Sequence, residues 1–255
     1  MKKKSPQFIV VLVLLFSLFS CVPSSKIVYL QDIAASQTNE IKAYETLLQP
    51  DDLLSIIVSS ENPENSIPFN LPQIQGNYEI GNNQNGIKTY LVDSDGNIDF
   101  PVLGKIKLAG LSRKEADQKL IELLSEYIKN PGINLRILNY KISVLGEVNR
   151  PGSYPIESER ITLLEALSKA GDLTIYGKRS DILVIREING IKNYKHIDIT
   201  KSDFINSDYY YLVQNDVVLV NPNRTRQNAS AVGPNTSVIL SAISILATIA
   251  VVLFK

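Results

Sequence analysis

The chain has 255 residues, which is long enough for two small domains with additional terminal segments. Lys and Arg together number 26, as do Asp and Glu, so no charge excess favours nucleic acid or an anionic surface as a partner. A single cysteine and a single histidine, His196, exclude an intrachain disulfide, a zinc site built on several cysteines and most imidazole-based chemistry.

Residues 1–20 are typical of a bacterial lipoprotein signal peptide. Three lysines precede a short apolar run from Phe8 to Phe19, and Cys21 follows where such signals place the residue that is lipidated after cleavage. The apolar run is too short to cross a bilayer comfortably. We therefore expect lipidation of Cys21, with residues 21–46 as a polar tether. The alternative is a plain secretory signal with a cysteine there by chance.

Residues 47–59 predict a turn that leads into a buried strand. Asp51 follows Pro50 in this turn, and aspartate tolerates the left-handed backbone conformation better than most residues. The adjacent carboxylates of Asp51 and Asp52 could instead serve acid–base or metal chemistry. However, neighbouring side chains ahead of a strand point apart and no partner cluster is visible, so turn chemistry is the preferred interpretation.

Residues 61–86 are rich in Pro, Asn, Gln and Gly and predict a long loop. One interpretation is an oligomer contact or a glycan-facing surface, since amide side chains suit sugar hydroxyls. The preferred interpretation is a solvated insertion.

Residues 90–138 predict a compact α+β unit that contains no catalytic motif. Ser112 and Glu115 have the spacing of a capping box, which opens a helix that ends at Asn130-Pro131. A tight turn is predicted at residues 93–96. The predicted extended segments of this unit are 90–92, 98–100, 106–108 and 133–137.

Residues 140–220 predict a second α+β unit. Thr162 and Glu165 repeat the capping box and open a helix that stops at Gly171. Asn189-Gly190 is a strong hairpin signal. The predicted strands are 142–146, 154–156, 182–186, 192–197 and 217–220. Tyr209, Tyr210 and Tyr211 could stack on sugar, but core or subunit-interface packing is the preferred reading, because neighbours on a strand face opposite sides.

The order of these motifs resembles the outer-membrane polysaccharide export lipoproteins. The resemblance rests on the run from Val92 to Gly110, the helix ending at Asn130-Pro131, and the sequel Val144–Val148 with Pro151-Gly152. It implies an α+β fold, with a polysaccharide export domain at residues 47–139 followed by one soluble-ligand-binding β-grasp domain at residues 140–222.

The C-terminal region predicts a polar linker at residues 223–236 and a membrane-spanning helix at residues 237–255. Seventeen nearly unbroken apolar positions would extend roughly 25 Å, which suits a thin outer membrane. Four hydroxyl residues fall on one helical face: Ser237, Ser241, Ser244 and Thr248. They would line a watery lumen in a ring of helices or pack against a neighbouring helix. A buried helix of a soluble domain is the remaining alternative.

The resemblance implies a non-enzymatic, oligomeric outer-membrane lipoprotein, with most of the chain in the periplasm, that forms a passive conduit for capsular polysaccharide or exopolysaccharide. It implies as partners further copies of the chain in a ring, the polysaccharide, outer-membrane lipid and an inner-membrane polysaccharide co-polymerase of the tyrosine-kinase type or similar. No catalytic residue, cofactor or metal site is expected, and no nucleic acid. The alternatives are a non-oligomeric periplasmic glycan-binding lipoprotein and an envelope hydrolase that uses Asp51, Asp52 and Asp95.

Overall fold

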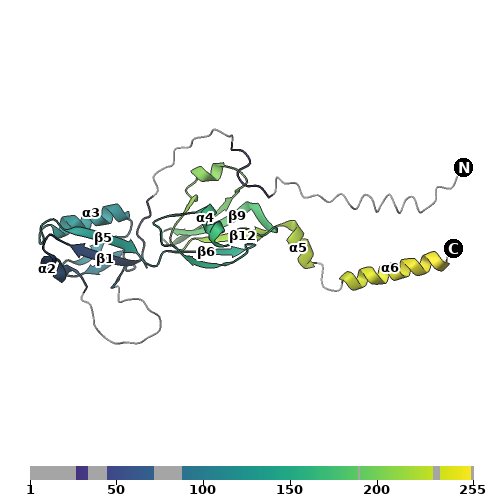
Figure 1. Ribbon diagram of the computed structural model, residues 1–255, viewed down its shortest axis with the longest axis horizontal. Helices are drawn as coiled ribbons and strands as arrows, with labels where there is room; N and C mark the ends of the chain where they lie inside the picture. The colour runs from purple at the N-terminus through teal and green to yellow at the C-terminus, as the bar shows by residue number, and fades with distance from the viewer. Residues whose placement is uncertain (1–26, 34–44, 72–87, 189, 232–235, 254–255) are drawn as a thin grey trace, which may run out of the picture.

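The computed structural model describes residues 27–33, 45–71, 88–188, 190–231 and 236–253 (Figure 1). The described residues contain two separate hydrophobic cores. One core extends from Leu48 to Leu135 and the other from Tyr140 to Val220. The mixed α+β class predicted from the sequence is confirmed.

The first core lies between two small sheets and a helix. Strand β1 (Leu53–Ser59) is central to an antiparallel sheet of order β2-β1-β5, with β2 at Tyr90–Leu91 and β5 at Gly132–Ile137. Strands β3 (Asn97–Phe100) and β4 (Gly104–Lys107) form a separate hairpin. The predicted turn before β1 is confirmed, because Asp51 has a φ of 68°.

Helix α3 (Arg113–Leu124) covers this core and begins at the predicted capping box. The Glu115 amide donates to the Ser112 hydroxyl, and the Ser112 amide donates to the Glu115 carboxylate. The prediction that the helix runs to Asn130 is wrong. Helical geometry ends at Leu124, and Ser125 turns its hydroxyl back onto the carbonyl of Ile121, 2.6 Å away.

The prediction of a long loop over residues 61–86 is also wrong for its first part. Residues Pro63–Ser66 form helix α2 and Ile67–Phe69 form a 3-10 turn, η2. The Asn62 side chain caps α2, and the Phe69 ring lies 5.8 Å from the Tyr127 ring and is buried. Residues 72–87, the remainder of the predicted loop, lie outside the described residues.

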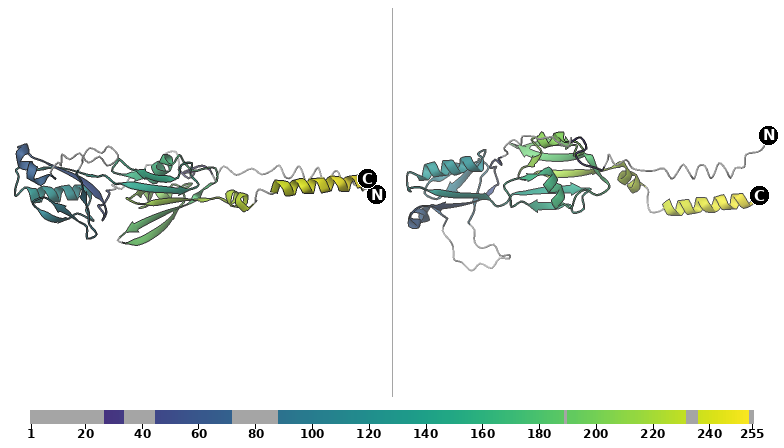
Figure 2. Two further views of the ribbon diagram at one scale, coloured as in Figure 1. Left: turned by 90° about the horizontal axis from the view of Figure 1, so that it is seen from below. Right: turned by 45° about the horizontal axis from the view of Figure 1, so that its top comes forward.

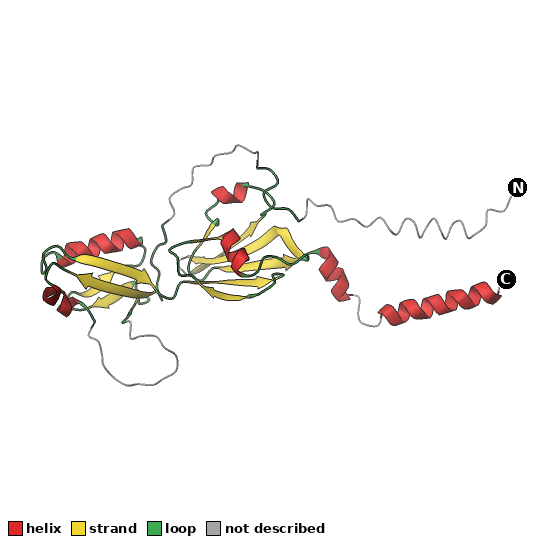
Figure 3. Cartoon of the chain, in the orientation of Figure 1, coloured by secondary structure: helices red, strands yellow, loops and turns green. Residues whose placement is uncertain are grey.

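The second core lies under a five-stranded sheet of order β10-β9-β12-β6-β7. Helix α4 (Leu163–Lys169), red in Figure 3, belongs to this unit and begins at the predicted capping box of Thr162 and Glu165. The predicted hairpin is confirmed by pairing of Ile188 with Ile191, although Asn189 itself lies outside the described residues. The strands of the sheet are β6 (Lys141–Gly146), β7 (Gly152–Pro155), β9 (Gly177–Ile188), β10 (Ile191–Ile197) and β12 (Val217–Pro222).

Shorter elements complete this unit. Strands β8 (Ile161–Thr162) and β11 (Tyr211–Leu212) pair with each other, and η3 (Asp203–Asn206) is a 3-10 turn. The two units are joined at Asn139, whose side chain accepts from the amide of Leu53 (2.8 Å) and whose carbonyl accepts from Gln214 (2.8 Å). Asn139 therefore bonds to both units, and the ion pair of Arg113 with Glu159 (3.1 Å) is a further contact between them.

The C-terminal region contains two helices where one was predicted (Figure 3). Helix α5 (Arg224–Ala231) occupies most of the predicted polar linker. The Asn223 side chain caps its first turn by accepting a hydrogen bond from the amide of Arg226 (3.0 Å). Helix α6 (Thr236–Leu253) forms where the membrane-spanning helix was expected. In the described part of the chain, however, no helix has the length and apolar character needed to cross a membrane. The spanning role predicted for residues 237–255 is therefore not supported.

Candidate assembly surface

The five-stranded sheet presents a second face that the second core does not use. In β9 and β12 alternate residues are buried, and the residues between them point to the opposite side. Strand pairing sets these outward residues in two rows: Tyr194, Ile185, Val217 and Ser143 in the first, and His196, Leu183, Leu219 and Leu145 in the second. We call these eight residues the outer sheet face.

The outer sheet face is mostly apolar and incompletely covered. Tyr194 is 62% exposed and Leu145 is 43% exposed, while the four aliphatic residues of β9 and β12 are half-buried. None of its apolar residues belongs to the side chains that form or flank the second core. Apolar patches of this kind mark protein or membrane contact sites. Since both faces of β12 are apolar, the sequence Val217–Val220 also reads as a strand buried on both sides.

Charged residues surround the outer sheet face. The Asp181 carboxylate is hydrogen-bonded to the His196 ring (2.5 Å) and to the Lys178 ammonium (2.8 Å). His196, the only histidine in the sequence, is therefore part of a polar cluster with these two residues. The hydrogen bond from Lys178 and then the one from His196 lower the pKa of Asp181. Lys192 lies on β10, an edge strand of the sheet, on the same side as Tyr194 and His196. Charges on an edge strand discourage unspecific strand pairing.

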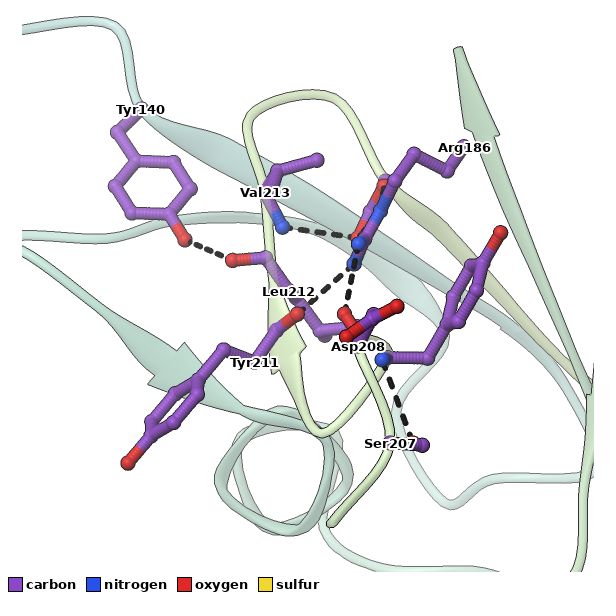
Figure 4. Close-up of polar contacts among 9 residues, drawn as sticks. Tyr140, Arg186, Ser207, Asp208, Tyr211, Leu212 and Val213 are labelled. Carbon is purple, nitrogen blue, oxygen red and sulfur yellow. Dashed lines mark hydrogen bonds and ion pairs between the residues drawn. The ribbon is translucent and has the colours of Figure 1, made fainter. Parts of the chain in front are cut away.

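A buried ion pair joins Arg186 and Asp216, and Figure 4 shows Arg186 with the polar contacts around it. The Arg186 guanidinium binds both carboxylate oxygens of Asp216, at 2.7–3.1 Å, and the side chains are at most 7% exposed. Its remaining donors reach the carbonyls of Asp208 and Tyr211, both at 2.9 Å. Burial raises the pKa of Asp216, and the Arg186 hydrogen bonds and charge oppose that shift. The hydrogen bonds of Arg186 and Asp216 are made within the protein, and we infer that the pair has a structural role.

The three consecutive tyrosines pack within the second unit, as preferred from the sequence. Arg186 lies 4.5 Å from the centre of the Tyr209 ring, and the rings of Tyr210 and Tyr211 meet edge to face at 4.9 Å. Tyr211 is buried, and the other two flank the core.

The residues predicted to carry membrane attachment are placed only in part. Cys21 and the signal segment lie outside the described residues. In α6 the hydroxyl of Ser244 donates to the carbonyl of Ser241 (2.9 Å), and that of Thr248 donates to the carbonyl of Ser244 (2.8 Å). These side chains are exposed along the helix. Nothing is described of the Ser237 side chain, so the lumen-facing stripe stays a prediction.

The described residues offer little for the hydrolase alternative. Among them no group of three or more His, Cys, Asp or Glu side chains could hold a metal ion. Asp52 is buried beneath the turn and accepts from the amide of Gln49 (2.8 Å). Asp95 lies in the exposed turn before β3. The Asp52 carboxylate therefore serves the local backbone.

Two known protein families match different parts of the chain. Residues 40–138 match the polysaccharide biosynthesis/export protein family, and residues 140–220 match the SLBB domain family. The two matches follow one another along the chain and support the polysaccharide export family that the sequence motifs indicated. Members of this family are transport proteins and not enzymes.

Two curated relatives are similar to this chain in particular. They are the EPS I polysaccharide export outer membrane proteins EpsA of Ralstonia solanacearum, 35% identical, and of Ralstonia nicotianae, 33% identical, each over 141 residues. Each alignment covers 53% of this chain and 37% of the relative, so the chain spans little more than a third of those proteins. Both names support the outer-membrane location expected from the sequence.

Proposed function

We propose that this protein assembles with further copies of itself into a ring that acts as a passive conduit for exopolysaccharide or capsular polysaccharide. The match to the export family supports the polysaccharide as cargo. The outer sheet face supports the assembly, since it is an apolar surface with a charged rim, which is the anatomy of a subunit interface. The proposed building units are residues 47–139 and 140–222, seated at the outer membrane through a lipidated Cys21.

The contact within such a ring joins different surfaces on neighbouring subunits. If the outer sheet face met its own copy, assembly would stop at a dimer, whereas a head-to-tail contact with a suitable rotation closes into a ring. A stable interface buries about 800 Å² per partner. The eight residues of the outer sheet face therefore form the centre of the contact, and the surrounding charged side chains complete it.

No covalent step is needed for this function. The ring would surround the polymer, and an inner-membrane polysaccharide co-polymerase would supply chain growth and driving force. Helix α6 adds an apolar surface to the membrane-facing part of the ring, where its hydroxyl stripe would pack against a neighbouring α6 or face the lumen.

The test is the mass of the full-length protein in mild detergent, compared with that of Leu145→Asp. A carboxylate placed on the outer sheet face cannot be buried without a partner, so we expect a discrete multi-subunit species to fall to monomer or small oligomer. Leu91→Asp, on β2 of the export domain, is the matched control because Leu91 is also an exposed strand leucine. Circular dichroism establishes that both variants fold.

A parent protein that is monomeric in detergent would contradict the conduit and favour the glycan-binding lipoprotein. An oligomer that Leu145→Asp leaves intact would move the contact to another surface.

A further inference from the structure

Residues 172–177 connect α4 to the start of β9, and we call them the 172–177 loop. The segment at residues 27–33 and the beginning of α5 both contact this loop. The hydroxyl of Tyr29 donates to the carboxylate of Asp172 (2.5 Å). The amide of Asn223 donates to the carbonyl of Tyr176 (2.7 Å), and the Arg226 guanidinium lies 5.4 Å from the centre of the Tyr176 ring.

Residues 27–33, part of the predicted polar tether, are held beside this loop by specific contacts. Buried Arg179 lies 5.5 Å from the centre of the Tyr29 ring. Three further hydrogen bonds fix the segment, from the Leu30 amide to the Ile199 carbonyl (3.1 Å), from the Gln31 amide to the Thr200 carbonyl (2.8 Å) and from the Ser202 amide to the Asp32 carboxylate (2.7 Å). The tether therefore leaves the second unit at a defined place.

The polar groups of the 172–177 loop are used inside the protein, while one apolar side chain points away from it. The Thr174 hydroxyl donates to Glu147 (2.9 Å), which also pairs with Arg226 (3.1 Å). Ile175, at the same loop, is 73% exposed and is the most exposed large apolar side chain of the described chain. The hydrogen bonds hold the loop in shape, so exposure of Ile175 is a property of the fold.

The elements that continue from this side identify what could cover Ile175. Helix α5 and then α6 extend away from the 172–177 loop, on the side opposite the export domain (Figures 1 and 2). Helix α6 exposes a series of large apolar residues, namely Val238, Ile239, Leu240, Ile243, Ile245, Leu246 and Ile249. Arg224, at the start of α5, is exposed and adds positive charge that suits lipid phosphate, whereas Arg226 is paired with Glu147.

We propose that the 172–177 loop is a lipid-contact surface, with Ile175 seated among the head groups and upper acyl chains of the membrane and Arg224 facing lipid phosphate. The docked tether and α5 fix this corner of the second unit against the bilayer, which sets the height and tilt of the domain. The inference rests on the outer-membrane location of the protein and is independent of whether the chain forms a ring.

The chain contains no tryptophan, so a single introduced indole reports its own surroundings. We would compare the full-length variants Ile175→Trp and Ile67→Trp, reconstituted into phosphatidylethanolamine–phosphatidylglycerol vesicles with and without brominated acyl chains. Ile67 is the matched control because it is 67% exposed and lies in η2 of the export domain. We expect a blue-shifted emission and loss of intensity in brominated lipid for Ile175→Trp, and neither for Ile67→Trp.

Each other outcome overturns the proposal. Unquenched emission at the wavelength of exposed indole would place the loop in water, and a blue shift without quenching would show that another copy of the chain covers it. Equal quenching of both variants would show unspecific adsorption. Because the ring is tested by mass in detergent, a monomer whose Ile175→Trp indole is quenched contradicts the ring alone, and an unquenched ring contradicts the lipid contact alone.

Discussion

At the residue scale, Asp52 has a carboxylate that the fold buries in the export domain. The side chain is 1% exposed, and one of its oxygens has no hydrogen-bond partner among the described residues. Burial raises its pKa to about 6, against the opposing hydrogen bond from the Gln49 amide. The folded protein therefore keeps a proton between about pH 4 and pH 6 that the unfolded chain has already released.

It follows that ionisation of Asp52 lowers the free energy of unfolding as the pH rises through 6. A shift of about two units corresponds to roughly 3 kcal/mol, fully lost only above the folded-state pKa. Asp52→Asn keeps an acceptor for Gln49 without the charge, so we expect it to be more stable than the parent at pH 7.5 by up to about 3 kcal/mol. The difference should vanish by about pH 4.

Urea unfolding at several pH values measures this difference. Asp99→Asn, an exposed strand carboxylate, is the control and should retain the pH dependence of the parent. If Asp52→Asn and the parent unfold in parallel across the pH range, the buried charge costs nothing and the argument is wrong.

At the element scale, the parallel pairing of β6 with β12 depends on a glycine at the end of β6. Gly146 has a φ of 88°, and a Cβ at this position would lie 2.1 Å from the carbonyl oxygen of Val220. The left-handed conformation alone costs an L-residue roughly 1–2 kcal/mol. The backbone contact adds to this cost, because neither strand can move without breaking the sheet.

We therefore expect Gly146→Ala to destabilise the second unit by more than about 3 kcal/mol, or to prevent its folding. Gly104→Ala is a matched control, since Gly104 has a φ of 73° but no atom within 4 Å of the added methyl group. Its cost should stay near 1–2 kcal/mol. Thermal unfolding measures the loss of stability in each variant. Equal losses in Gly146→Ala and Gly104→Ala would show that the close contact with Val220 does not destabilise the protein.

At the scale of the whole molecule, α6 is a helix whose described apolar side chains are exposed in the single chain. Such a surface is stable only when lipid or another protein covers it. Removing it should leave both cores intact, because neither contains a residue of α6.

We expect a chain that ends at Val232 to fold with unchanged secondary structure in residues 45–231 but to form fewer or weaker oligomers in mild detergent. Light scattering on the truncated and full-length proteins measures the change. Identical masses would show that α6 has no part in the assembly, and a truncated protein that fails to fold would contradict the independence of the two cores.

The sequence by itself determined the elements whose ends are stabilised by neighbours a few residues away. The boxes at Ser112–Glu115 and Thr162–Glu165, the left-handed Asp51 and the Gly190 hairpin all depend on contacts between near neighbours in the chain. Such contacts have almost the same geometry wherever they occur, so residue type and spacing predict them.

Only the tertiary structure decided the features that depend on distant partners. The tether is held through Tyr29 and Asp172, which are 143 residues apart in sequence, and Phe69 is buried against Tyr127. The outer sheet face likewise exists only because four strands are aligned in register. The sequence predicted a polar tether at residues 21–46, a long loop at residues 61–86 and a polar linker at residues 223–236. In residues 27–33, 61–71 and 223–231, which belong to the described parts of these segments, the order comes from contacts with surfaces that only the folded chain brings together.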